Sequence, residues 1–67
     1  MTPKHYKMAI QPVEYILAND LDFCSGNIVK YISRLGKKGD PVSDLIKIIE
    51  YAKILLDKYD KENNATI

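Results

Sequence analysis

The chain has 67 residues, a formal net charge of +1 at pH 7, one cysteine and one histidine. This length fits one domain, whose core rarely supplies more than about 3–5 kcal/mol of net stability alone. Cys24 and His5 allow neither an intrachain disulfide nor a closed four-ligand zinc site. We therefore expect that the protein binds no metal and gains additional stability by packing as a homo-oligomer.

The amino-terminal part predicts an extended arm followed by a short helix. Residues 1–10 show no helical periodicity and include Pro3, which blocks helix continuation. Pro12 suits the first turn of a helix, and Asn19-Asp20 favours a stop. The spacing i, i+3, i+4 predicts a buried stripe on this helix, formed by Val13, Ile16 and Leu17.

A second helix is predicted to begin near Asp22 and to end at Gly36, which can adopt the left-handed cap conformation. Its expected core side carries Ile28, Ile32 and Leu35. A separate polar face recurs at i, i+3, i+4 and i+7 and consists of Asn27, Lys30, Tyr31 and Arg34. Gly26 inside a helix is unfavourable and predicts close approach of a neighbouring backbone or a ligand.

The third helix should be the longest, because Asp40-Pro41 is a strong start signal. Its apolar stripe consists of Leu45, Ile48, Ile49, Ala52, Leu55, Leu56 and Tyr59. Ile46 and Ile54 widen this stripe beyond what one small partner helix would cover, which predicts a subunit interface through the third helix. Residues 60–67 are polar and are expected to fray. The predicted fold is one small all-α domain over residues 1–67.

Charge is distributed unevenly along the chain. Up to Lys38, six basic residues face three acidic ones, whereas from Gly39 onward four lysines face six carboxylates. This field suits a small anionic ligand better than a DNA duplex, so we expect no sequence-specific DNA binding. No segment approaches the roughly 20 apolar residues of a membrane span, and residues 1–12 lack an apolar signal region. We therefore predict a cytoplasmic location and no membrane partner.

The clearest candidate site combines the polar helix face with the basic turn that follows it. Its expected phosphate-binding residues are Lys30, Arg34, Lys37 and Lys38, with Asn27 and Tyr31 available to read a base or sugar. His5 and Tyr6 of the arm could close over it by proton transfer and by stacking. The alternative is a solvated face whose charges complement the helix C-terminal dipole, with an arm that only packs Tyr6 on the core.

Other chemistries have weaker support. The glycines do not match the Walker A spacing, and no strand precedes them, so a P-loop is excluded as far as sequence allows. No paired carboxylates, metal-ligand spacing or Ser-His-Asp set is present. Cys24 near a helix start could have a lowered thiol pKa, although a buried, inert thiol is the commoner outcome.

Several short motifs together resemble a known family. They run from His5-Tyr6-Lys7 through Ile10-Gln11-Pro12, Glu14-Tyr15-Ile16, Leu21-Asp22-Phe23, Gly26-Asn27, Lys30-Tyr31-Ile32, Arg34 and Gly36-Lys37-Lys38 to Asp44-Leu45, Lys47 and Tyr51. The pattern is similar to the small phage proteins called SaV-like, catalogued as a domain of unknown function. That family includes a nucleotide kinase that works as an oligomer without a P-loop.

The resemblance implies a phage-encoded helical domain in a bacterial cell. The positions shared with the family are His5, Tyr6, Gln11, Glu14, Gly26, Asn27, Lys30, Tyr31, Arg34, Lys37 and Lys38. It implies a nucleotide site in which Gln11 and Asn27 orient the ligand and His5 is the candidate catalytic residue. The kinase branch extends beyond this domain, which leaves phosphoryl transfer by this chain in question, since it would require ATP and Mg²⁺.

Two main hypotheses follow. The first is a phage nucleotide-binding protein that could be a minimal nucleoside monophosphate kinase. The second is a non-catalytic phage protein that sequesters a nucleotide signal or binds and inhibits a host protein. A third, structural role, in which the basic face contacts acidic protein surfaces, is not separable from the second by sequence.

Overall fold

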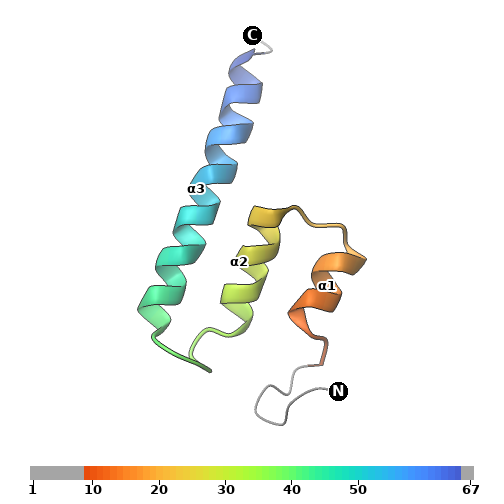
Figure 1. The fold of residues 1–67 in the computed structure, drawn as a ribbon. Coiled ribbons are helices and arrows are strands. Elements are labelled where there is room, and N and C mark those ends of the chain that lie inside the picture. Colours follow the sequence, from red (N-terminus) through yellow and green to blue (C-terminus); the bar gives the residue numbers. More distant parts are fainter. Residues whose placement is uncertain (1–8, 66–67) are drawn as a thin grey trace.

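The computed structural model describes residues 9–65, with side chains through residue 62. Three helices follow one another along the chain: α1 (Pro12–Ala18), α2 (Phe23–Ser33) and α3 (Pro41–Ala65). The described residues contain no strand, so the predicted small all-α fold is confirmed (Figure 1).

Local hydrogen bonds explain where the helices begin. The backbone N–H of Gln11 donates to Glu14 Oε1 at 3.1 Å, which is one half of a capping box for α1. Asp22 caps α2 by accepting from the Ser25 backbone N–H at 2.7 Å and from the Ser25 hydroxyl at 3.0 Å. Asp40 precedes Pro41 and accepts from the backbone N–H of Val42, so the predicted start of α3 is confirmed.

The chain reverses direction through residues in the left-handed backbone region. Gly36, predicted to end the second helix, has φ +76° and follows the last turn of α2, and Gly39 has φ +74°. Asp20 has φ +53° after α1, an arrangement that Asp tolerates better than most residues. The backbone N–H of Leu21 donates to the Ile16 carbonyl, and that of Asp20 to the Leu17 carbonyl. This pair of bonds forms a Schellman motif that closes α1.

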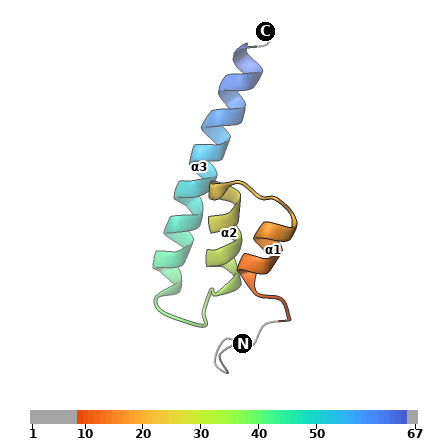
Figure 2. The same cartoon turned by 45° about the vertical axis from the view of Figure 1, so that its right-hand side comes forward.

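The helices are arranged in a linear order, with α2 between α1 and α3 (Figures 1 and 2). Within the described residues, α2 packs against both neighbours, and α1 makes no close backbone approach to α3. The C-terminal part of α3 projects beyond the other two helices in both views. Much of the surface of α3 therefore has no neighbour within the described chain.

Burial differs from the predicted pattern. Of the predicted α1 stripe only Ile16 is half-buried, whereas Val13 and Leu17 are 59% and 74% exposed, so the prediction is wrong at two of three positions. Ile32, expected on the core side of α2, is also exposed. No hydrophobic residue of the described part is fully buried. The physical reason is that each helix has a neighbour on one or two sides only, which leaves the rest of each apolar face uncovered.

The length of α3 also differs from expectation. Residues 60–67 were predicted to fray, but α3 continues through Ala65. Lys61 Nζ lies 3.3 Å from Asp57 Oδ2, an i,i+4 pair of the kind that supports an exposed helix. This pair supports the helix at the beginning of the segment that composition alone favoured as a tail.

Asp22 supplies a pH-dependent contribution to folding. The Ser25 backbone N–H, followed by the Ser25 hydroxyl, holds the pKa of Asp22 below its ordinary value of 3.8. The ionised cap therefore stabilises the folded state above that pH, and the contribution is lost as pH falls through the lower folded-state pKa. Asp22→Asn should reduce stability at pH 7, and the difference from wild type should shrink below about pH 4.

Urea unfolding followed by circular dichroism at several pH values would measure this effect. Glu50→Gln, which removes an exposed carboxylate in the middle of α3, is the matched control and should leave the profile unchanged. A constant difference between Asp22→Asn and wild type down to about pH 2 would show that the charge of the cap is irrelevant.

Candidate functional site

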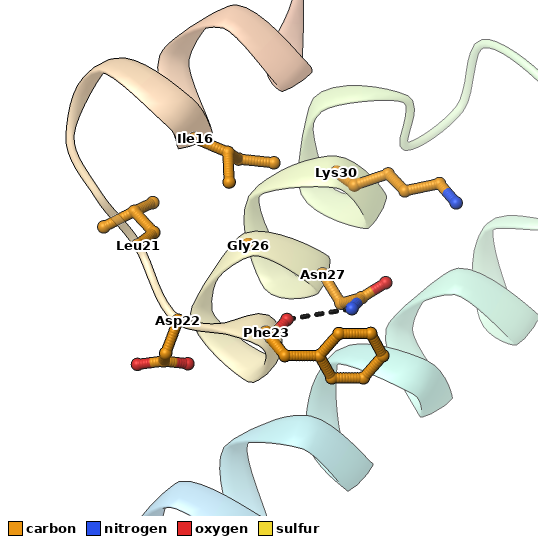
Figure 3. A pocket seen from close by; sticks show the side chains of 7 residues that line it. All are labelled: Ile16, Leu21, Asp22, Phe23, Gly26, Asn27 and Lys30. Atoms are coloured by element: carbon orange, nitrogen blue, oxygen red, sulfur yellow. Dashed lines mark hydrogen bonds between the residues drawn. The ribbon is translucent and has the colours of Figure 1, made fainter.

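A small hollow lies between α1 and α2 (Figure 3). Its volume is about 180 Å³, and its lining consists of Ile16, Leu21, Asp22, Phe23, Gly26, Asn27 and Lys30. Typical small-molecule sites measure about 300–1,000 Å³. This hollow therefore suits one ring or a short chain of a ligand, with the remainder held outside it.

Gly26 sets the depth of the hollow. It is the buried residue of α2, and a Cβ placed there would lie 3.0 Å from Ile16 Cγ2. The missing side chain lets α1 approach α2 closely, while the turn at Asp20 brings Leu21 to the edge of the same hollow. A neighbouring group does approach Gly26 closely, as predicted, but it is the side chain of Ile16 and not a backbone or a ligand.

Polar groups occur at one rim of the hollow. Figure 3 shows Phe23, Asn27 and Lys30 extending from the same side of α2. Asn27 donates its side-chain N–H to the Phe23 carbonyl at 2.8 Å, which fixes the orientation of the amide. Phe23 is largely exposed, and Lys30 is exposed as well. The rim therefore presents an aromatic ring, a fixed amide and an ammonium group within two turns of one helix.

Next to this rim, two cations share one aromatic ring. Lys30 Nζ lies 5.4 Å from the centroid of Tyr31, and the guanidinium carbon of Arg34 lies 4.9 Å from it. Tyr31 stacks on Tyr51 of α3 with centroids 6.3 Å apart, and Phe23 meets Tyr51 edge-on at 5.9 Å. Cations within about 6 Å of a ring face are attracted by its quadrupole. The aromatic group thus holds both positive charges at the junction of α2 and α3.

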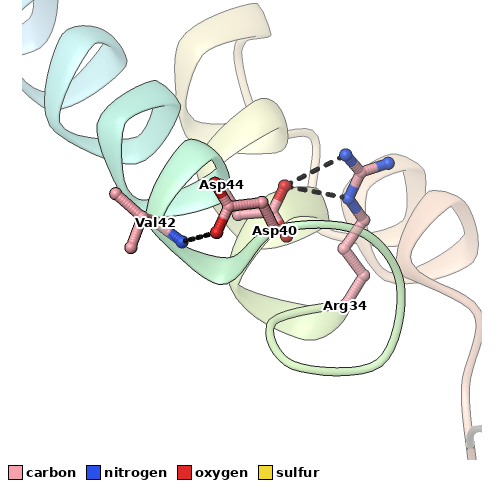
Figure 4. Close-up of polar contacts among 4 residues, drawn as sticks. All are labelled: Arg34, Asp40, Val42 and Asp44. Carbon is pink, nitrogen blue, oxygen red and sulfur yellow. Dashed lines mark hydrogen bonds and ion pairs between the residues drawn. The ribbon is translucent and has the colours of Figure 1, made fainter.

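A part-buried ion pair anchors Arg34. Its Nε and Nη2 donate to Asp44 Oδ1 at 3.3 and 3.0 Å (Figure 4). Asp44 is only 2% exposed, and its Oδ2 has no hydrogen-bond partner in the described part of the chain. Part of the Arg34 charge is therefore compensated by α3, and the guanidinium is held against the helix junction.

The predicted site residues are thus only partly brought together. Asn27, Lys30, Tyr31 and Arg34 form one surface, and its second half faces α3 instead of open solvent. Lys37 Nζ donates to the Ser33 carbonyl at 3.0 Å, Lys38 lies in the exposed turn, and Gln11 lies at the start of α1. His5 and Tyr6 lie outside the described residues.

Sequence reasoning missed several contributors to the site. Phe23 and Leu21 were not recognised as lining residues, and Asp44 was not recognised as the partner of Arg34. The one available signal was Gly26, whose position inside a helix indicated that another group approaches there. Asp44 gave no such signal, because acidic residues are common in the first turn of any helix.

Neither a metal-binding cluster nor a membrane-spanning helix is found in the described part of the chain. Within residues 9–65, no group of three or more His, Cys, Asp or Glu side chains is arranged to hold a metal ion. In the same range, no helix combines the length and apolar character needed to cross a bilayer.

Comparison with family models identified a family for this chain. A model described as a protein of unknown function, DUF3310, matches residues 1–53. The chain belongs to the DUF3310 family. Neither a search of curated proteins nor one of solved structures found a match. The DUF3310 match includes every residue of the hollow and of the adjoining cation–aromatic surface, whereas the C-terminal part of α3 lies outside it.

Proposed function

We propose that this chain binds a nucleotide, or a similar small phosphate compound, across the rim of the α1–α2 hollow. The supporting observation is the pair of cations, Lys30 and Arg34, held over the Tyr31 ring beside an apolar hollow edged by Phe23. A phosphate would lie against the Lys30 ammonium. The base would stack on Phe23, which exposes three quarters of its surface, and Asn27 would orient the sugar or base.

The volume of the hollow favours binding over catalysis by a single chain. Phosphoryl transfer must hold two nucleotides and usually Mg²⁺ in line, whereas about 180 Å³ accommodates part of one nucleotide. We therefore place non-catalytic nucleotide capture, in a phage-infected bacterial cytoplasm, ahead of a minimal nucleoside monophosphate kinase. The kinase alternative would require ATP, Mg²⁺ and a contribution from His5.

Replacing Lys30 with glutamate tests the proposal. We expect the affinity for a nucleotide to fall about ten- to hundredfold, since a hydrogen bond to a charged group contributes about 1.5–3 kcal/mol. The measurement is a two-dimensional NMR titration of the full chain with the four deoxynucleoside monophosphates, ATP and inorganic phosphate. Lys47→Glu makes the same charge change on an exposed position of α3 and should bind as wild type does.

Three outcomes separate the alternatives. Binding of nucleotides that is lost in Lys30→Glu supports capture, and diphosphate product formed from a monophosphate with ATP and Mg²⁺ would establish the kinase. Absence of any resonance shift at millimolar nucleotide, or unchanged binding by Lys30→Glu, would disprove the site.

A further inference from the structure

Helix α3 carries an exposed apolar row beside the row of side chains that packs on α2. The row facing α2 consists of Asp44, Ile48, Tyr51 and Leu55, which are buried or half-buried. The neighbouring row, here called the seam, consists of Val42, Leu45, Ile49, Ala52, Leu56 and Tyr59, all of them exposed. The seam spans about 25 Å of helix at 1.5 Å per residue, and it contains no charged residue.

The spacing of the seam is that of a coiled coil. Its intervals alternate three and four residues from Val42 to Tyr59, so Val42, Ile49 and Leu56 occupy a positions and Leu45, Ala52 and Tyr59 occupy d positions. Such a row packs by inserting each side chain between four residues of a facing helix with the same periodicity. The flanking e positions carry Ile46, Lys53 and Asp60, so the character of these positions changes from apolar to charged toward the C-terminus.

The described part of this chain cannot cover the seam itself. α1 has seven residues and makes no close backbone approach to α3, and α2 is engaged by the adjacent row. The C-terminal part of α3 projects beyond both helices (Figure 2). The occupant must be a helix of similar length with the same alternating spacing, and α3 of another copy meets both requirements.

We propose that two copies of this chain associate through the seam, with α3 packed along α3 of the second copy as a two-stranded coiled coil. The number two follows from the residue types of the seam. β-branched residues at a with Leu at d favour two strands in parallel coiled coils, and Val42 and Ile49 occupy a positions with Leu45 at d. Pairing would also supply the buried apolar surface that the separate chain lacks.

The experiment is sedimentation equilibrium of the full chain and of two isoleucine variants. Wild type should have twice the chain mass of 7.7 kDa. Ile49→Lys, on the seam, should reduce the mass to one chain. Ile54→Lys is the matched control, because Ile54 lies on another side of α3 with the same residue type and a similar exposure, 55% against 52% for Ile49. This variant should retain the mass of two chains.

Thermal unfolding at two protein concentrations covers the case in which Ile49→Lys fails to fold. The midpoint of wild type should rise with concentration, as mass action requires for an associating protein. A wild-type mass of one chain, a mass above two chains, a concentration-independent midpoint, or a dimeric Ile49→Lys would each overturn the proposal. None of these measurements involves a nucleotide, so the outcome is independent of the proposed function.

Discussion

Arg34→Ala should lower the free energy of unfolding by about 2–4 kcal/mol. The substitution removes both hydrogen bonds to Asp44 Oδ1 and leaves a carboxylate that is 3% exposed without its counter-charge. Breaking a buried pair costs about 3–5 kcal/mol, and we reduce the figure because the Arg34 side chain is 34% exposed and partly screened. Urea unfolding followed by circular dichroism, at equal protein concentrations, gives the value.

The partner variant should behave differently. Asp44→Ala leaves the guanidinium near enough to the surface to be hydrated, so a smaller loss of about 1–2 kcal/mol is expected, part of it from the helix dipole. The double variant should be about as stable as Asp44→Ala. Equal losses of unfolding free energy for the two single variants, or a double variant less stable than Arg34→Ala, would mean that the unpaired Asp44 carboxylate is not the source of the destabilisation.

Gly26→Val should detach α1 and lower the free energy of unfolding by about 1–3 kcal/mol, the usual cost of overpacking. The added side chain would enter the space now taken by Ile16 Cγ2, which lies 3.0 Å from an ideal Cβ. Since, among the described helices, α1 approaches only α2, the effect should be local. Amide hydrogen exchange should accelerate across α1 while the α2–α3 pair keeps its protection.

A compensating variant identifies the cause. Ile16→Ala removes Cγ2, so Gly26→Val combined with Ile16→Ala should be less destabilised than the sum of the two single changes. Gly26→Ala is the graded control. Alanine favours the helix over glycine by up to about 1 kcal/mol, and a small shift of Ile16 can relieve the close contact of its Cβ, so the net change in stability should be small. Additive losses in the double variant would place the effect of Gly26→Val elsewhere than at Ile16.

Helix boundaries were largely predictable from the sequence because their signals are local. Asp22 and Asp40-Pro41 act on backbone groups within a few residues, and both are found at the predicted helix starts. Gly36 has the predicted left-handed conformation, but α2 ends three residues earlier, at Ser33. Burial was less predictable. Periodicity shows that a helix has an apolar stripe but not which neighbour covers it, and α1 leaves Val13 and Leu17 exposed.

In the candidate site, too, local spacing was predictable from the sequence, whereas contacts between helices were not. Asn27, Lys30, Tyr31 and Arg34 share one helix face, so their proximity followed from spacing alone. The pairing of Arg34 with Asp44 depends on how the turn after α2 positions the first turn of α3, which spacing does not specify. The hollow likewise exists only because α1 docks at Gly26.

The linear order of the helices implies rapid folding of each chain. Each helix packs only on the one next to it in sequence, so no native contact between helices waits for the closure of a long loop. Proteins dominated by such local contacts fold in microseconds to milliseconds. The folding of each chain should therefore be complete within the dead time of stopped-flow refolding. A slower phase that arises from the proposed pairing of two chains should accelerate with protein concentration, whereas one that arises from proline isomerisation should not.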